Sequence, residues 1–251
     1  MSALGELPSL VGRSHECDFP REVAELPVCT RPRIDVSGSS REIDAQVKDT
    51  FLNGLSIYEV FDEVLERLQP THIITQTHCE VCAVSLRDVE NSVAAKLASR
   101  PRIISLQPDS LEGIWSDIRQ VASALKVEGV GEKLIFDLQH RMKSIARLAR
   151  DSRHRPTVAC IEWLEPLMAA GNWMPELVAM AAGVNLLGWR GKHSPWVSWD
   201  DLADRDPDVI VAMPCGFDLA RAAQEMYLSD GEPALAPTTS RANRPNLHRR
   251  R

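Results

Sequence analysis

Two segments of this sequence share a pattern that is typical of parallel α/β folds. Residues 207–218 and 70–82 each begin with a proline that ends a helix, continue with a short β-branched apolar run, and end in a polar turn that carries cysteine. Such a run predicts a strand buried in a parallel sheet. Open α/β sheets bind ligands beyond the carboxyl ends of their strands. The two segments therefore predict two α/β lobes whose strand ends face one cleft.

Composition narrows the class of protein. The chain has 251 residues, of which 44% are hydrophobic and 25% charged, as in soluble globular proteins. A net charge of −6 does not favour a nucleic-acid binder. No apolar run reaches the roughly 20 residues that cross a bilayer. The N-terminus has no secretory signal, so the chain is cytoplasmic at face value and periplasmic if a leader precedes it.

The remaining periodicity predicts further elements. Apolar residues at helical spacing predict a helix over 132–150, long enough to join two lobes as a strut. Other patterns predict helices over 41–53, 59–69, 86–98, 111–125, 172–182, 200–205 and 218–227, and strands over 9–13, 72–76, 102–106, 157–163 and 208–213. Asp109 and Ser110 are both candidate N-caps for the helix over 111–125, and Asn172 is the expected N-cap of the helix over 172–182.

These elements predict four parts of the chain. An N-terminal α/β lobe covers 1–112, connecting helices cover 113–152, and a C-terminal α/β lobe covers 153–228. Residues 229–251 have no periodicity and are rich in arginine, which predicts a disordered basic tail.

Cysteine and histidine follow several predicted strands. Six cysteines in a chain of this length do not form a disulfide framework, so reduced thiols are expected. Soft metals or an iron–sulfur cluster bind such side chains. The residues of this metal alternative are Cys17, Cys79, Cys82 and Cys215. A Cys–His nucleophile is a further alternative, although no oxyanion hole or orienting carboxylate is identified.

Tryptophan is concentrated in the second predicted lobe. Trp163, Trp173, Trp189, Trp196 and Trp199 lie within it, mostly in predicted loops. Some are expected in the core. Loop tryptophans at strand ends form flat apolar walls for large ligands, so we expect a ligand role for Trp196 and for Trp163 or Trp173.

Read in order, the segments 11–20, 75–85, 161–168, 171–177, 193–196 and 214–218 resemble one family. The chain is similar to cobalamin-binding proteins of the ABC-importer substrate-binding class, two-lobed proteins of the iron-siderophore and cobalamin type. The resemblance implies two Rossmann-like lobes with parallel sheets, joined by a single long helix. It also implies a second lobe that is incomplete, because members continue past Asp218 with another α/β segment.

The resemblance implies a binding protein without catalytic residues or a catalytic cofactor. Cobalamin or a related corrinoid is the expected ligand, bound between the lobes of a monomer that delivers it to an ABC permease. The resemblance implies the following ligand-binding residues: His15, Cys17, Phe19, Gln76, Cys79, Cys82, Trp163, Trp173, His193, Trp196, Gly216 and Phe217. Glu59 and Asp200 or Asp201 are the expected docking residues for the permease. Haem or a siderophore remains an alternative ligand on the same fold.

Overall fold

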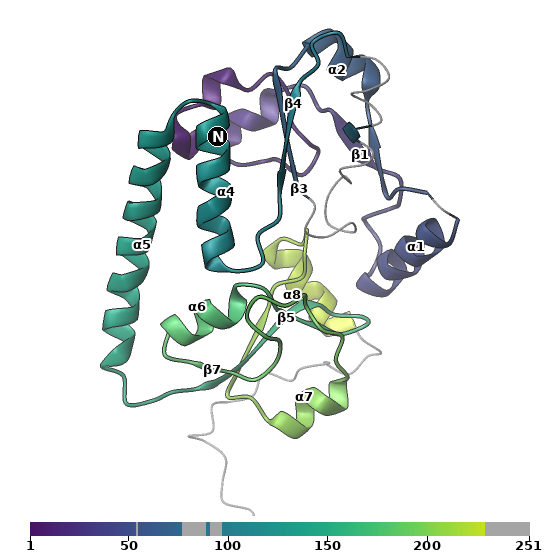
Figure 1. Ribbon diagram of the computed structural model, residues 1–251. Coiled ribbons are helices and arrows are strands. Elements are labelled where there is room, and N and C mark those ends of the chain that lie inside the picture. The colour runs from purple at the N-terminus through teal and green to yellow at the C-terminus, as the bar shows by residue number, and fades with distance from the viewer. Residues whose placement is uncertain (54, 77–88, 91–96, 229–251) are drawn as a thin grey trace, which may run out of the picture. The chain divides into compact units, whose positions relative to one another are not determined.

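The computed structural model describes residues 1–53, 55–76, 89–90 and 97–228 (Figure 1). The chain has the predicted α/β fold and divides into two compact units, Met1–Leu148 and Ala149–Arg251. The predicted partition of the chain at residues 112 and 152 stays a prediction. Among the described residues, no helix combines the length and apolar character needed to cross a bilayer.

Two parallel strands form one sheet of the first unit. β3 (His72–Gln76) pairs with β4 (Arg102–Leu106), with Ile74 opposite Ile104. Ile104 is buried, and it packs with α4 (Leu111–Ala124) through Val121 and Ala122. Both strands occupy the predicted positions, because β-branched residues suit a strand buried on its faces.

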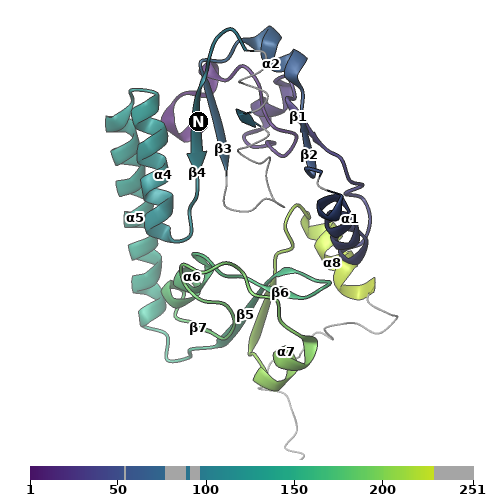
Figure 2. The ribbon, with the colours of Figure 1, turned by 45° about the vertical axis from the view of Figure 1, so that its right-hand side comes forward.

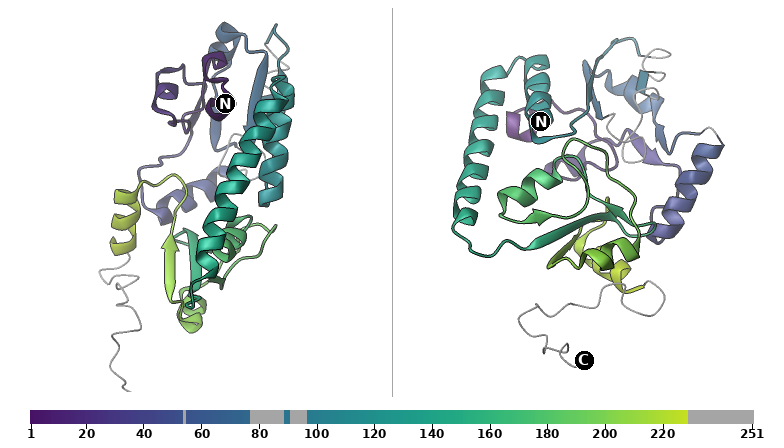
Figure 3. Two further views of the ribbon diagram at one scale, coloured as in Figure 1. Left: turned by 90° about the vertical axis from the view of Figure 1, so that its left-hand side faces the viewer. Right: turned by 60° about the horizontal axis from the view of Figure 1, so that its bottom comes forward.

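α4 continues into α5 (Glu128–Arg150), the long helix that the sequence predicts. Ser110 caps α4 as expected, since its hydroxyl accepts the N–H of Gly113 at 3.2 Å. In the first turn of α5, Gly131 lies so close to Ala122 that a side chain at 131 would meet the Ala122 methyl group. The two helices run side by side, and α5 extends well beyond α4 (Figure 3).

A second, antiparallel pair of strands corrects one prediction. β1 (Thr30–Pro32) pairs with β2 (Tyr58–Val60), and only then does α2 (Asp62–Leu68) begin. The helix predicted over 59–69 is therefore wrong at its start. Tyr58 and Val60 have side chains that favour strands, and their pairing with β1 outweighs the helical spacing of the apolar residues that follow.

The N-terminal segment differs from the prediction as well. Short 3₁₀ helices cover Ser2–Leu4, Leu7–Ser9 and Arg21–Glu25. The strand predicted over 9–13 is absent, and Arg13 forms only an isolated bridge with Val28. α1 (Ser40–Leu52) follows, with a capping box between Ser39 and Glu42. The helix predicted over 86–98 falls mostly outside the described residues.

The second unit is built on a mixed sheet around β5 (Thr157–Trp163) (Figure 2). β7 (Val184–Asn185) and β8 (Val209–Ala212) pair with β5 in parallel, and β6 (Met168–Ala169) pairs with it antiparallel. The sequence predicts β5 and β8, whereas β6 and β7 contain only two residues each and give no periodic signal.

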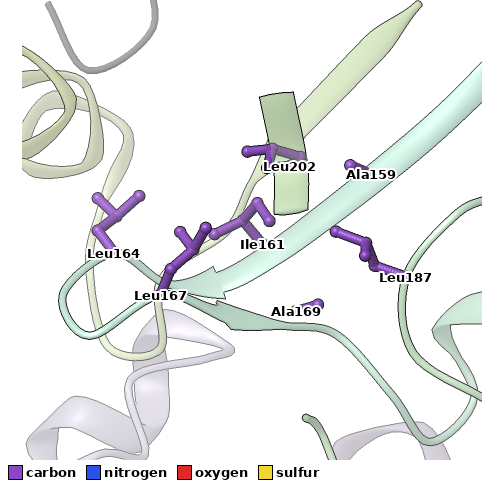
Figure 4. Packing of buried hydrophobic residues seen from close by; sticks show 7 residues of the cluster. All are labelled: Ala159, Ile161, Leu164, Leu167, Ala169, Leu187 and Leu202. Atoms are coloured by element: carbon purple, nitrogen blue, oxygen red, sulfur yellow. The ribbon is translucent and has the colours of Figure 1, made fainter. Parts of the chain in front are cut away.

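Three helices surround this sheet: α6 (Met174–Met180), α7 (Trp199–Arg205) and α8 (Leu219–Leu228). One core cluster comprises Ala159, Ile161, Leu164, Leu167, Ala169, Leu187 and Leu202 (Figure 4). The expected N-cap at Asn172 is wrong, because Trp173 holds that position and Asn172 has a left-handed φ of 54°. Pro175 lies in the first turn of α6 as expected.

Candidate functional site

In the first unit, the guanidinium of Arg13 organises the loop that carries several predicted ligand residues. Arg13 Nη1 donates to the carbonyl oxygens of Ser14 and Cys17 at 3.1 Å and to that of His15 at 3.4 Å, and Nη2 donates to the carbonyl of Ala24. The Ser14 carbonyl also accepts the Cys17 N–H at 3.3 Å, so both contacts hold this part of the loop. The loop therefore has a defined conformation although it contains no helix or strand.

His15 is held at the base of this loop. Its backbone N–H donates to Thr30 Oγ1 at 3.1 Å, and its ring Nδ1 lies 2.8 Å from the same oxygen. The ring packs against Tyr58, with the ring centroids 5.3 Å apart. Nε2 lies 3.3 Å from Glu16 Oε1 without the geometry of a hydrogen bond. Burial lowers the pKa of His15, partly opposed by the Glu16 carboxylate and assisted by Arg13.

The loop leaves two other predicted residues exposed. The Cys17 thiol is free and accepts a hydrogen bond from the Ser14 hydroxyl at 3.3 Å. Phe19 is 88% exposed. Gln76 is half-buried at the carboxyl end of β3. Cys79 and Cys82 lie outside the described residues.

In the second unit, an irregularity in β5 determines which way Trp163 faces. Ile161 pairs with Ala169, but Trp163 pairs with Met168, so the register shifts by one residue between the two pairs. Without the shift, Trp163 would share the buried face of Ile161. With it, Trp163 shares the face of Met168, because residues directly opposite on neighbouring strands point the same way.

A third residue extends this row. Met168 also forms an antiparallel bridge with Trp196, so Trp163, Met168 and Trp196 lie side by side on one face of the sheet. Neighbouring strands are about 4.8 Å apart, which separates the two tryptophan backbones by roughly 10 Å. Trp163 is half-buried and Trp196 is 58% exposed. We call these three residues the Trp–Met–Trp row.

Phe217 adds to the row from the loop after β8. Its ring meets Trp163 edge to face at a centroid distance of 5.6 Å, and the guanidinium of Arg221 lies 3.7 Å from its centroid. Gly216 precedes it with a left-handed φ of 76°, and Cys215 is exposed. The indole N–H of Trp163 donates to the Glu165 carbonyl at 3.1 Å, which limits its rotation.

Two other predicted ligand residues lie near one another in a different part of this unit. The N–H of Asn172, beside Trp173, donates to the Lys192 carbonyl, and the N–H of Gly171 donates to the buried Ser194 hydroxyl at 3.1 Å. The neighbouring residue His193 is exposed, with Nδ1 2.9 Å from the Ser194 carbonyl. Neither Trp173 nor His193 belongs to the Trp–Met–Trp row.

The two predicted docking residues have different surroundings. Glu59 on β2 accepts a hydrogen bond from Arg31 Nε at 2.7 Å and lies 4.0 Å from Arg33. Asp200 is exposed in the first turn of α7. Its neighbour Asp201 completes the capping box of that helix with the N-cap Ser198, and hydrogen bonds from Ser198 lower the pKa of the Asp201 carboxyl.

The metal alternative has little support in the described part of the chain. No group of three or more His, Cys, Asp or Glu side chains there is arranged to hold a metal ion. Burial raises the pKa of the Cys29 and Cys160 thiols, so neither favours the thiolate form that binds metals. Cys79 and Cys82 of the predicted set lie outside the described residues.

Sequence reasoning missed Arg13, Thr30, Met168 and Arg221. Arg221 had a local signal, because Asp218 starts a helix by accepting the N–H of Arg221 at 2.8 Å, which places Arg221 one turn after Phe217. Met168 had no local sequence signal, because its neighbours in the sheet depend on the register shift in β5.

The sequence model of the periplasmic binding protein family matches residues 1–235. Among solved structures, a periplasmic heme binding protein from Pseudomonas aeruginosa is 20% identical with a TM-score of 0.66, over 95% of this chain and 75% of that one. The periplasmic vitamin B12 binding protein BtuF of Vibrio cholerae is 18% identical with a TM-score of 0.58, over 84% and 70%.

The apo form of the periplasmic heme-binding protein RhuT from Roseiflexus sp. RS-1 is 21% identical with a TM-score of 0.62, over 93% of this chain and 80% of that one. At such identities the likeness shows the two-lobed fold. A comparison with curated protein sequences finds no match.

Proposed function

This chain belongs to the periplasmic binding protein family, and from that premise we propose that it binds cobalamin or a related corrinoid for an ABC-type importer. The family consists of solute-binding proteins and not of enzymes, so the chain is a substrate-binding protein of the importer type. The corrinoid, the permease partner and a periplasmic location are the finer parts of the proposal.

The Trp–Met–Trp row is the observation that carries the proposal. A corrin is broad and flat, with apolar faces and amide groups around its rim. Two tryptophans roughly 10 Å apart, with a methionine between them, offer a flat apolar surface of matching width. Phe217 widens this surface beside Trp163. The polarisable thioether of Met168 adapts to an irregular macrocycle.

Residues of the first unit are proposed to contact the ligand as well. His15 and Cys17 carry nitrogen and sulfur atoms of the kind that bind cobalt, and the amide of Gln76 suits the amides of the rim. The exposed ring of Phe19 would be covered by the ligand. Trp173, His193 and Gly216 complete the proposed set within the described residues.

Docking on a permease is proposed to involve Glu59 and Asp200. Asp200 is exposed and available to a cation of the permease. Glu59 already pairs with Arg31, so a permease arginine would share or replace that contact. This difference makes Asp200 the stronger of the two candidates.

Haem is a second candidate ligand, favoured by the cation beside Phe217. Haem carries two carboxylates on its rim, whereas the side chains on the corrin rim of cobalamin are mostly neutral amides. The Arg221 guanidinium lies against Phe217, so a planar ligand resting on Phe217 would bring its rim near a fixed positive charge. The names of two similar proteins, from Pseudomonas aeruginosa and Roseiflexus, specify heme.

Direct titration separates these ligands. Purified chain would be titrated with cyanocobalamin and, separately, with haemin, while tryptophan fluorescence and co-elution in gel filtration are recorded. We expect cyanocobalamin to quench the fluorescence and to co-elute with the protein. Folded protein that neither responds to nor co-elutes with cyanocobalamin would overturn the corrinoid proposal, and a response to haemin alone would establish the second candidate.

A further inference from the structure

The charges of α5 are distributed unevenly along the helix. Two ion pairs lie near its start: Arg119 of α4 contacts Glu132 at 2.7 Å, and Lys133 contacts Asp137 at 2.6 Å. After Asp137, every charged residue of the helix is basic, namely Arg141, Lys143, Arg147 and Arg150. All four are exposed, and none forms an ion pair with another described residue. The net charge of the whole chain is −6.

Most of these cations share one face of the helix. His140, Lys143, Arg147 and Arg150 follow one another at intervals of three and four residues, which places them in one row. We call this row the basic face of α5. It extends about 15 Å, from the rise of the helix per residue. Such a row of like charges repels itself unless a negatively charged partner lies against it.

One large exposed apolar side chain lies in line with the basic face. Phe136, four residues before His140, is 67% exposed and stacks on the His140 ring at a centroid distance of 6.2 Å. Leu148 is 77% exposed and Ile145 is 49% exposed, but they lie about 100° or more around the helix from Arg147, outside the basic face. Exposed apolar residues next to lysine and arginine are typical of helices that lie in the headgroup region of a membrane.

From this juxtaposition we propose that the basic face of α5 binds the surface of a bilayer that contains anionic phospholipids. The cations would contact lipid phosphates, while Phe136 would enter the headgroup layer. The mixture of charge and apolar surface favours a bilayer over nucleic acid, which would bury the apolar side chains against phosphates. Weak adsorption of this kind would keep a substrate-binding protein close to its membrane-embedded partner.

The structure predicts how much the cations contribute. Each lysine or arginine near an anionic bilayer strengthens binding by about fivefold, so three of them together contribute about a hundredfold. Because this attraction is screened over about 10 Å at 0.1 M salt, binding should weaken steeply as salt is added. Neither expectation depends on which ligand the chain carries.

The test is co-sedimentation of the full chain with vesicles of phosphatidylcholine that contain, or lack, 30% phosphatidylglycerol. A triple variant, Lys143→Gln, Arg147→Gln and Arg150→Gln, removes the cations of the basic face. Its matched control removes three exposed cations of the first unit elsewhere: Arg21→Gln, Arg67→Gln and Arg102→Gln. Circular dichroism and thermal melting would show that both variants fold.

We expect the chain and the control variant to bind anionic vesicles at low salt, and the α5 variant to bind about a hundredfold more weakly. Equal binding to vesicles without phosphatidylglycerol would overturn the proposal. An equal loss of vesicle binding in both variants would also overturn the proposal. Binding would then depend on the total charge of the chain and not on the basic face. If the chain ignores anionic vesicles but binds polyglutamate through the same cations, the partner is an acidic polypeptide and the proposal fails.

Discussion

The rings of Trp163 and Phe217 meet edge to face, with their centroids 5.6 Å apart and their planes inclined by 62°. Trp163 ends β5, and Phe217 follows β8, the parallel strand beside it. Carboxyl ends of neighbouring parallel strands lie at one edge of a sheet, where open α/β folds place ligands. The aromatic contact therefore lies at the edge of the second unit that we propose to bind the ligand, and each ring supports the orientation of the other.

Replacing Trp163 tests whether this edge binds the ligand. Trp163→Ala removes one end of the Trp–Met–Trp row and the support of Phe217. We expect the affinity for the bound macrocycle to fall by about ten- to a hundredfold, the value of a large aromatic contact. Trp189→Ala is the matched control, because Trp189 is 66% exposed and outside the row. Equal affinities of the two variants, measured by absorbance titration, would contradict the assignment.

Arg221 provides a test that distinguishes the two candidate ligands. Arg221→Gln removes the cation that lies 3.7 Å from the Phe217 ring centroid. For haem we expect about a tenfold loss of affinity, because a charge-assisted contact to a carboxylate is lost. For cyanocobalamin we expect little change. A larger loss of affinity for cobalamin than for haem, in parallel titrations, would contradict the proposed contact between Arg221 and a haem carboxylate.

The parallel strands and the long helix could be predicted because their signals are local. The β-branched runs of β3, β4, β5 and β8 and the apolar stripe of α5 are each visible in one short stretch of sequence. Ser110 is likewise a local capping signal. Asn172 resembled one, but the pairing of its backbone with Lys192 leaves it in a left-handed conformation, and α6 starts after it.

The candidate site was predicted only in part, since its geometry depends on long-range pairing. Trp163 and Trp196 were expected to face a ligand, and the sheet register puts both on the face of Met168. The register shift in β5 that produces this row has no marker in the sequence. The helix predicted over 59–69 failed for the same kind of reason, because the pairing of Tyr58 with Pro32 is a contact between distant segments.

Gly171 tests the packing that positions Trp196. A side chain at Gly171 would overlap the Lys192 carbonyl oxygen and crowd the backbone of His193 and Ser194. Gly171→Ala should therefore push the segment before Trp196 away from β6 and destabilise the protein by about 2 kcal/mol. Gly129→Ala is the control. Its side chain would meet nothing within 4 Å, and alanine favours helix, so stability should be unchanged or slightly raised. Chemical denaturation would measure both.

The surroundings of His15 predict a dependence of stability on pH. Burial lowers the pKa of His15 in the folded chain below its ordinary value of 6.5, so the unfolded chain binds the proton more readily. The stabilising contribution is thus complete above pH 6.5 and is lost as pH falls through 6.5 toward the lower folded value. His15→Asn should lose less stability than the natural chain between pH 7.5 and 5.5 by thermal melting. Identical losses would contradict this account.

The four described thiols should separate into two reactive and two protected groups. Cys17 and Cys215 are exposed, whereas Cys29 and Cys160 are buried, and burial raises the pKa of both buried thiols. A maleimide reacts with the thiolate, so burial slows it by restricting access and by favouring the protonated form. In a variant with Cys79→Ser and Cys82→Ser, mass spectrometry should find two fast additions at Cys17 and Cys215. Denaturant should expose all four thiols. Labelling of Cys160 at the rate of Cys215 in the folded protein would contradict the burial of β5 in the core of the second unit.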